Sequence, residues 1–241
     1  MPLRLLSANI QAGQSTRAYS EYITRGWGHV LPNGKRANMA ALAEMARGFD
    51  IVGLQESDPG SLRSGFQNQT QWLAERAAFP YWSHQPNRRV GRIASSANGL
   101  LANQQPRTVL DYPLPGRLGG RGVMLAKFGE GEAAWTLAVT HLSLSIAARR
   151  QQVDFLAELL KDHPRAVLMG DFNCPATAPE LETLYRRTSL VPPPHAPPTF
   201  PSWAPVRSLD HVFSAGLSVS DYAAVPAAGS DHLAVALTIH P

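Results

Sequence analysis

Residues 166–173, with the sequence AVLMGDFN, are the stretch that decides the fold. A short apolar run that ends in Gly170 is typical of a buried strand, and the glycine lets the backbone turn directly after it. Asp171 and Asn173 are two residues apart, so both can point the same way from that turn. An Asx turn would explain the same two residues without any chemistry. The stretch therefore predicts a buried strand that presents a carboxylate and an amide at its end, and it leaves open whether they are functional.

The same unit, a short apolar run followed by a polar residue able to bind metal or move a proton, recurs along the chain. Residues 3–8 lead to Asn9, residues 50–55 to Glu56 and residues 135–140 to His141. Buried strands of this kind deliver side chains from their ends to one rim of a sheet. Each residue alone has a plainer interpretation, since most such glutamates lie on the surface and most such histidines in a core.

A second group of titratable residues lies near the end of the sequence. Asp231 and His232 precede an apolar run, which places a carboxylate and an imidazole side by side at a sheet rim. Asp210 opens another run and could hold the tautomer of an imidazole by a hydrogen bond. Histidine is the side chain that titrates unperturbed near neutral pH, so the group suits proton transfer. A strand-initiating turn with a satisfied histidine is the structural alternative.

Helical patterns separate the apolar runs, as expected for an α/β protein. Seven prolines between Arg186 and Arg207 predict an extended loop there and not a helix. Neither an internal repeat nor a long linker divides the chain, so residues 1–241 are expected to form one domain. The expected helices are 36–47, 67–78 and 147–161, and the further expected strands are 99–102, 107–110, 122–127, 210–214, 218–222 and 233–239.

Composition narrows the function classes. The net charge is +4, and only three of the 22 basic residues are lysines, which favours recognition of phosphate by guanidinium groups over a diffuse nucleic-acid coat. The single cysteine, Cys174, excludes an intramolecular disulfide framework and a cysteine-rich zinc site. No apolar run approaches the ~20 residues of a membrane span, and a cytoplasmic location is expected. Six arginines gather in one segment, at positions 88, 89, 92, 107, 117 and 121; they either flank the rim or cover sheet edges.

Taken in order, these motifs resemble the endonuclease/exonuclease/phosphatase superfamily, which includes DNase-I-like nucleases, abasic-site endonucleases, neutral sphingomyelinases and inositol polyphosphate phosphatases. The resemblance covers nearly the whole chain. It implies a four-layer α/β/β/α sandwich with the site at one rim, and a divalent-metal-dependent phosphoesterase. The motifs that carry it are Asn9, Leu54-Gln55-Glu56, Thr140-His141-Leu142, Gly170-Asp171-Phe172-Asn173, Leu209-Asp210-His211 and Ser230-Asp231-His232.

The resemblance also implies roles for single residues. Glu56 would bind the metal, supported by Asn9 and Asp231. Asp171 and Asn173 would position water, leaving group and phosphate. His141 and His232 would donate to phosphoryl oxygens or transfer protons, with Asp210 orienting His232. Oxygen ligands of this kind suit Mg²⁺ or Mn²⁺.

The substrate is the least determined feature. A phosphodiester or a phosphomonoester fits, with a slight preference for a phospholipid or a small phosphate ester because the chain carries no appended nucleic-acid module. A DNA or RNA nuclease of the same fold is the first alternative. A non-catalytic module that binds a phosphorylated ligand or a protein is the second, although every expected site position is filled. No obligatory protein partner is evident.

Overall fold

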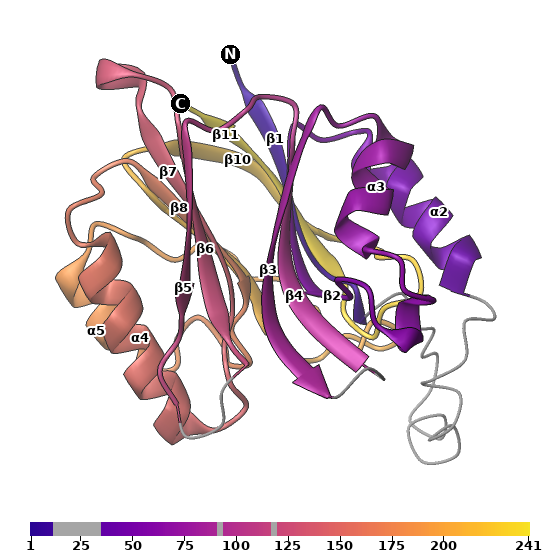
Figure 1. Ribbon diagram of the computed structural model, residues 1–241. Coiled ribbons are helices and arrows are strands. Elements are labelled where there is room, and N and C mark those ends of the chain that lie inside the picture. Colours follow the sequence, from indigo (N-terminus) through magenta and orange to yellow (C-terminus); the bar gives the residue numbers. More distant parts are fainter. Residues whose placement is uncertain (12–34, 91–93, 117–119) are drawn as a thin grey trace.

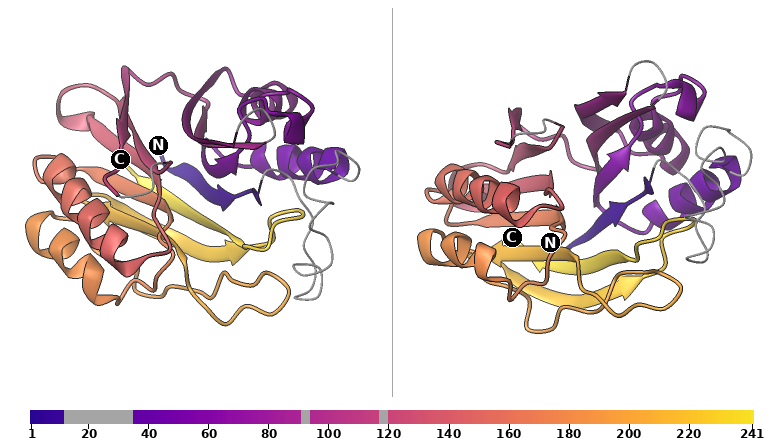
Figure 2. Two further views of the ribbon diagram at one scale, coloured as in Figure 1. Left: turned by 60° about the horizontal axis from the view of Figure 1, so that its bottom comes forward. Right: turned by 90° about the horizontal axis from the view of Figure 1, so that it is seen from below.

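Two β-sheets lie face to face in this computed structural model, with helices on both outer sides (Figure 1). The structure describes residues 1–11, 35–90, 94–116 and 120–241. In this part of the chain the first sheet has six strands in the order β10-β11-β1-β2-β4-β3, and the second has five in the order β5-β6-β7-β8-β9. The two views in Figure 2 show the same arrangement of sheets between helices from other directions.

The strands of the first sheet are β1 (Leu3–Asn9), β2 (Ile51–Ser57), β3 (Tyr81–Val90), β4 (Ala94–Ala102), β10 (Ser218–Val225) and β11 (Ala234–His240). Those of the second are β5 (Thr108–Pro113), β6 (Gly122–Phe128), β7 (Trp135–His141), β8 (Ala166–Asp171) and β9 (Asp210–Ala215). The α-helices are α2 (Lys35–Ala46), α3 (Gln69–Ala77), α4 (Ile146–Leu160) and α5 (Glu182–Arg187). Short 3₁₀ helices are η2 (Leu62–Ser64), η3 (Gly131–Ala133) and η4 (Pro179–Leu181).

Alternating side chains of the central strands fill separate layers of the core. In β1, Leu6 packs with α2 and α3, whereas its neighbour Leu5 packs between the sheets. In β8, Leu168 packs with α4 and α5, whereas Val167 and Met169 face the first sheet. This period of two is the one that a strand buried on both faces requires. The four-layer α/β/β/α sandwich predicted from the sequence is confirmed.

One rim of the sandwich collects the ends of strands from both sheets. β1 runs parallel to β2, and β7 runs parallel to β8, so each pair ends at the same side. The chain crosses from β1 to β2 through α2 and from β7 to β8 through α4. β9 and β11 are antiparallel to β8 and β1, so they begin where their neighbours end. The predicted polar residues at 9, 56, 141, 171, 210 and 232 therefore lie at one rim.

Three local details differ from the sequence-based expectations. The strand β3 was not among the expected strands; it contains Pro86, and as an edge strand it tolerates the missing N–H. The expected loop from Arg186 begins later, since Arg186 and Arg187 form the last turn of α5. Glu56 does not follow its strand but lies inside β2, at a bulge. Among the described helices, none has both the length and the apolar character needed to cross a membrane.

Gly170 is fixed by a close approach of two backbones. Its φ is 153°, and a β-carbon at this position would lie 1.9 Å from the carbonyl oxygen of Thr140 in β7. Because Thr140 pairs directly with Gly170 in the central ladder, the strand cannot move away without breaking the register.

We expect Gly170→Ala to lower the free energy of unfolding by about 3 kcal/mol or more, through backbone strain and overpacking. Gly65→Ala is the matched control, because Gly65 also has a positive φ of 65° but meets no atom within 4 Å. That control should cost only about 1–2 kcal/mol. Urea unfolding followed by circular dichroism measures both. Equal losses in the two variants would contradict a role for the contact with Thr140.

Candidate active site

Three of the predicted site residues lie side by side on neighbouring strands of the second sheet. His141 on β7 is the register partner of Asp171 on β8, and Asp171 is the partner of Asp210 on β9. Their exposed fractions are 2%, 1% and 1%. Adjacent strands lie about 4.8 Å apart, so strand pairing alone brings the three residues into one row.

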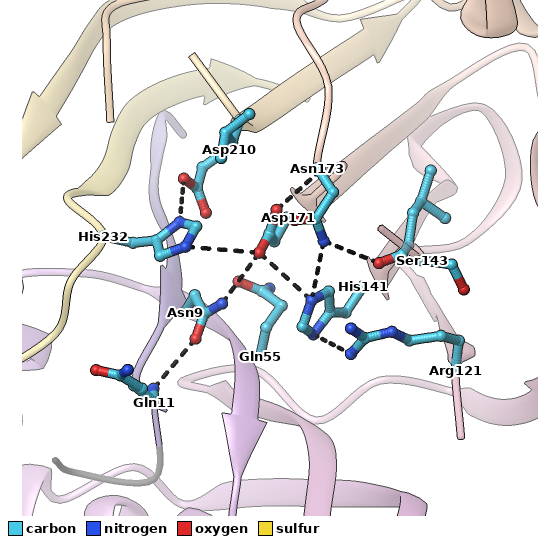
Figure 3. Close-up of polar contacts among 12 residues, drawn as sticks. Asn9, Gln11, Gln55, Arg121, His141, Ser143, Asp171, Asn173, Asp210 and His232 are labelled. Atoms are coloured by element: carbon cyan, nitrogen blue, oxygen red, sulfur yellow. Dashed lines mark hydrogen bonds and ion pairs between the residues drawn. The ribbon is translucent and has the colours of Figure 1, made fainter. Parts of the chain in front are cut away.

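The turn after β8 makes Asp171 and Asn173 part of one structure. The backbone N–H of Asn173 donates to Asp171 Oδ1 at 2.9 Å, which is the Asx turn considered from the sequence. Asn173 has a φ of 54°, and its side-chain amide donates to the Leu142 carbonyl oxygen at 3.0 Å. The turn and the site are therefore not alternatives here, because the same turn aims both side chains at the rim (Figure 3).

His232 is held by Asp210. The His232 Nδ1 lies 2.7 Å from Asp210 Oδ2, and both side chains are buried. A carboxylate only accepts, so Nδ1 carries a proton and the second nitrogen, Nε2, faces Asp171 Oδ2 at 3.9 Å. Burial alone would lower the pKa of His232, but the carboxylates of Asp210 and Asp171 outweigh it and raise the pKa to about 10. His232 is therefore an imidazolium near neutral pH, with an N–H pointing toward Asp171.

His141 has the opposite protonation. A guanidinium nitrogen of Arg121 lies 2.8 Å from His141 Nδ1 and can only donate, so Nδ1 accepts and Nε2 carries the proton. Burial lowers the pKa of His141 well below its usual range, and the charges of Arg121 and His232 lower it further. The Asn173 amide nitrogen lies 3.3 Å from this protonated Nε2. Two N–H donor groups thus lie side by side at the rim, the kind of group that an oxyanion site requires.

Asp171 lies at the centre of these contacts (Figure 3). Its Oδ2 accepts from the Asn9 amide at 3.0 Å and lies 3.4 Å from His141 Nε2. Burial is the largest influence on the pKa of Asp171 and raises it. The positive charge of His232 lowers this pKa and the negative charge of Asp210 raises it, so that it reaches about 7. The link from Asn9 to Asp171 also joins the two sheets, because the residues lie on β1 and β8.

Oxygen ligands gather on the side of the first sheet. Glu56 lies at a β-bulge with a φ of 57°, an uncommon conformation for a residue other than glycine. Its carboxylate is half-buried and makes no hydrogen bond or ion pair with the described residues. The carbonyl oxygen of Asn9 accepts from Ser230 Oγ at 2.6 Å, which ties β1 to the segment that carries Asp231. Strained backbone of this kind gathers at functional sites.

A cavity of about 310 Å³ brings these groups together. It is lined by seven of the eight predicted site residues, namely Asn9, Glu56, His141, Asp171, Asn173, Asp231 and His232. Asp210 does not line the cavity and contacts His232 from behind. A larger cavity of about 780 Å³ lies at the other end of the second sheet, next to Trp135 and Arg107, and contains none of the predicted residues.

Several residues of the cavity were not predicted as site residues. Arg121 belonged to the arginine-rich segment, whose members Arg92 and Arg117 lie outside the described residues. Arg207 gave no signal beyond its place three residues before Asp210, and Phe200 gave none. The further lining residues are Gln11, Arg121, Leu144, Phe200, Arg207 and Leu209.

The donor set fits a hard divalent cation. The cavity holds the carboxylates of Glu56, Asp171 and Asp231 and the amide of Asn9, and oxygen ligands of this kind suit Mg²⁺ or Mn²⁺. Single ligand atoms of Asp171, Asp210 and His232 also lie within 4.8 Å of one another. In that second group, however, Asp210 and His232 already bind each other through their nearest atoms. The oxygen side, where Glu56 has no partner among the described residues, is the better fit.

Comparisons with known proteins identify the family and agree with the fold. A family model described as endonuclease/exonuclease/phosphatase family matches residues 6–232. Among solved structures, one described as an endonuclease/exonuclease/phosphatase from Beutenbergia cavernae DSM 12333 is similar with a TM-score of 0.76 and 20% identity, covering 99% of this chain and 71% of that one. A mannosyl-6-phosphatase of Bacteroides thetaiotaomicron VPI-5482 has a TM-score of 0.68 and 17% identity, with 99% and 100% covered. A humanized TDP2 of D. rerio has a TM-score of 0.70 and 15% identity, with 100% and 99% covered. None of the curated proteins matches this chain.

Proposed function

Because the chain belongs to the endonuclease/exonuclease/phosphatase family, we propose that it hydrolyses a small phosphate ester or a phospholipid head group with Mg²⁺ or Mn²⁺. The chain is a divalent-metal-dependent phosphoric ester hydrolase. The observation that carries the narrower proposal is the 310 Å³ cavity, which gathers oxygen ligands on one side and N–H donors on the other. A space of this size suits one phosphoryl group with a small part of the leaving group.

Glu56, Asn9 and Asp231 would hold the ion at the side of the first sheet. A divalent ion bound there supplies positive charge that polarises the phosphoryl group and stabilises the leaving oxygen. The half-buried Glu56 carboxylate is available for this purpose because none of the described residues binds it.

The residues of the second sheet would act on the phosphoryl group itself. His141, neutral and protonated at Nε2, donates to one phosphoryl oxygen together with the Asn173 amide. His232, held as an imidazolium by Asp210, donates to another phosphoryl oxygen as negative charge grows in the transition state. Asp171 accepts a hydrogen bond from the attacking water and orients it, since its carboxylate lies between both histidines and the Asn9 amide.

An apolar side chain on a well-fixed loop at the cavity supports the preference for an organic leaving group. Leu144 lines the cavity and is 78% exposed. The loop that carries it is fixed, because Arg149 on α4 donates to the Leu144 and Ser143 carbonyl oxygens at 2.7 and 3.2 Å. Arg149 is held in turn by Glu180 at 2.6 Å. An exposed leucine on such a well-fixed loop is positioned to contact the carbon part of a substrate.

A hydrolysis screen tests the proposal. Purified protein with Mg²⁺ or Mn²⁺ is assayed on an aryl phosphomonoester, an aryl phosphodiester, dispersed phospholipids, abasic DNA and plasmid DNA. We expect turnover on small esters or phospholipids to exceed turnover on either DNA substrate. Preferred cleavage of DNA would overturn the substrate proposal and favour the nuclease alternative, and activity on none of the substrates would contradict hydrolysis by this cavity.

A further inference from the structure

Arg207 is a cavity residue that the proposed mechanism does not use. It lies just before β9 and is paired with Phe200 by two backbone hydrogen bonds, each of 2.9 Å. A third bond, from the Thr199 N–H to the Arg207 carbonyl oxygen at 2.8 Å, continues the pairing. The backbone of Arg207 is therefore fixed relative to the strand that carries Asp210, although its side chain is exposed.

The guanidinium of Arg207 lies over the ring of Phe200. It lies 5.8 Å from the centroid of the Phe200 ring, within the range of a cation–π contact. The Phe200 ring in turn lies 5.0 Å from the ring of His232. Within the described residues Arg207 forms no ion pair. The Phe200 ring thus contacts both the Arg207 guanidinium, which has no ion-pair partner among the described residues, and the imidazole that faces Asp171.

The charges around the cavity indicate what this cation can bind. Two arginines line the cavity, and Arg121 is already bound to His141 Nδ1. Three carboxylates line it as well, those of Glu56, Asp171 and Asp231, and they repel an anion that enters. Of these two arginines, Arg207 is the one whose guanidinium forms no hydrogen bond or ion pair with the described residues, so its donors can bind a substrate.

A phosphomonoester needs such a cation more than a phosphodiester does. Its second pKa is about 6, so near neutral pH it carries close to two negative charges and three non-bridging oxygens, whereas a diester carries one charge. The planar guanidinium can donate to two phosphate oxygens at once. An extra arginine near the phosphoryl site therefore favours the more highly charged ester.

We propose that Arg207 binds the phosphate of the substrate and that the cavity prefers phosphomonoesters to phosphodiesters. This inference rests on the proposed function, because it concerns the same cavity, and it narrows the substrate class. Phe200 acts as a positioning residue that holds the guanidinium at the cavity wall.

The test compares Arg207→Gln with the parent protein on p-nitrophenyl phosphate and on methyl p-nitrophenyl phosphate, which share a leaving group. We expect kcat/KM on the monoester to fall about tenfold or more, and on the diester by less than about threefold. Arg207→Lys should recover part of the loss on the monoester, since it restores the charge without the planar donor pair. Arg150→Gln is the matched control, because Arg150 is exposed on α4 and does not line the cavity, and it should leave both rates unchanged.

Binding of inorganic phosphate gives a second measurement that needs no turnover. In the presence of Mg²⁺, calorimetry should show a Kd about tenfold higher for Arg207→Gln than for the parent. Equal losses on both esters, unchanged phosphate binding, or a parent protein that hydrolyses only the diester would each overturn the inference. The last result would leave the proposed hydrolysis standing, whereas a parent that hydrolyses no ester would contradict the proposed function and leave phosphate binding to decide the role of Arg207.

Discussion

Replacing His232 by alanine should lower turnover by a factor of about 10² or more, because the imidazolium donates where negative charge grows in the transition state. Metal binding should be nearly unchanged, since the proposed ligands lie on the side of the first sheet. The expected signature is a lower kcat with a similar requirement for Mn²⁺, measured on the best ester from the screen.

The loss of activity caused by Asp210→Asn should depend on the presence of His232. Its carboxylate lies 2.7 Å from His232 Nδ1 and does not line the cavity, so Asp210→Asn acts through the imidazole. That variant should lose less activity than His232→Ala, and the double variant should be little worse than His232→Ala alone.

Circular dichroism and urea unfolding provide the control for this pair, because both side chains are buried and His232→Ala leaves the Asp210 carboxylate without its partner. Among variants that fold normally, fully additive losses would contradict the coupling of Asp210 to His232. His141 would then be the better candidate for the essential imidazole.

Removing the divalent ion should abolish activity, and Glu56→Gln should weaken the binding of that ion. The substitution keeps the size and the hydrogen-bonding groups of the side chain but removes the negative charge that an oxygen-binding cation requires. EDTA treatment followed by stepwise return of Mn²⁺ measures activity, and calorimetric titration with Mn²⁺ measures affinity directly. We expect Glu56→Gln to raise the Kd for Mn²⁺ about tenfold or more.

Glu44→Gln is the matched control for the second experiment, because it also removes one carboxylate but lies exposed on α2 and outside the cavity. If Glu56→Gln binds Mn²⁺ as tightly as the parent protein, Asp171 or Asp231 would be the better candidate for the main ligand of the ion. Full turnover of thoroughly chelated protein would contradict a metal-dependent mechanism.

Apolar runs and the polar residues at their ends predicted most of the fold and most of the cavity wall. The prediction worked because parallel strands end on one side of a sheet, so a polar residue after each run reaches the same rim. The same reasoning extends to the backbone at Gly170 and Asn173. A glycine was expected at this turn, and the structure shows why: a β-carbon at Gly170 would collide with the carbonyl oxygen of Thr140. The roles of the single residues remain proposals.

Other parts of the site could not be predicted because they depend on contacts between distant segments. Arg121 fixes the tautomer of His141 only because β6 pairs with β7, and nothing near either residue in the sequence indicates that contact. The contacts of Phe200 with Arg207 and His232 join a proline-rich loop to the segment before β11. The bulge at Glu56 gave no signal either, since a single extra residue in a strand leaves the apolar pattern almost intact.

The position of β1 between β2 and β11 has a consequence during protein synthesis. Leu3 pairs with Ile239, so all the residues between them must be synthesised before the six-stranded sheet can close. Contacts of such long sequence separation form late and slow folding. Until they form, Asn9 lacks its bond from Ser230, and His232 lacks its place beside Asp171. A phosphate-ester hydrolase built in this way stays inactive until β11 has been made and paired with β1, and loss of β11 by proteolysis would inactivate it.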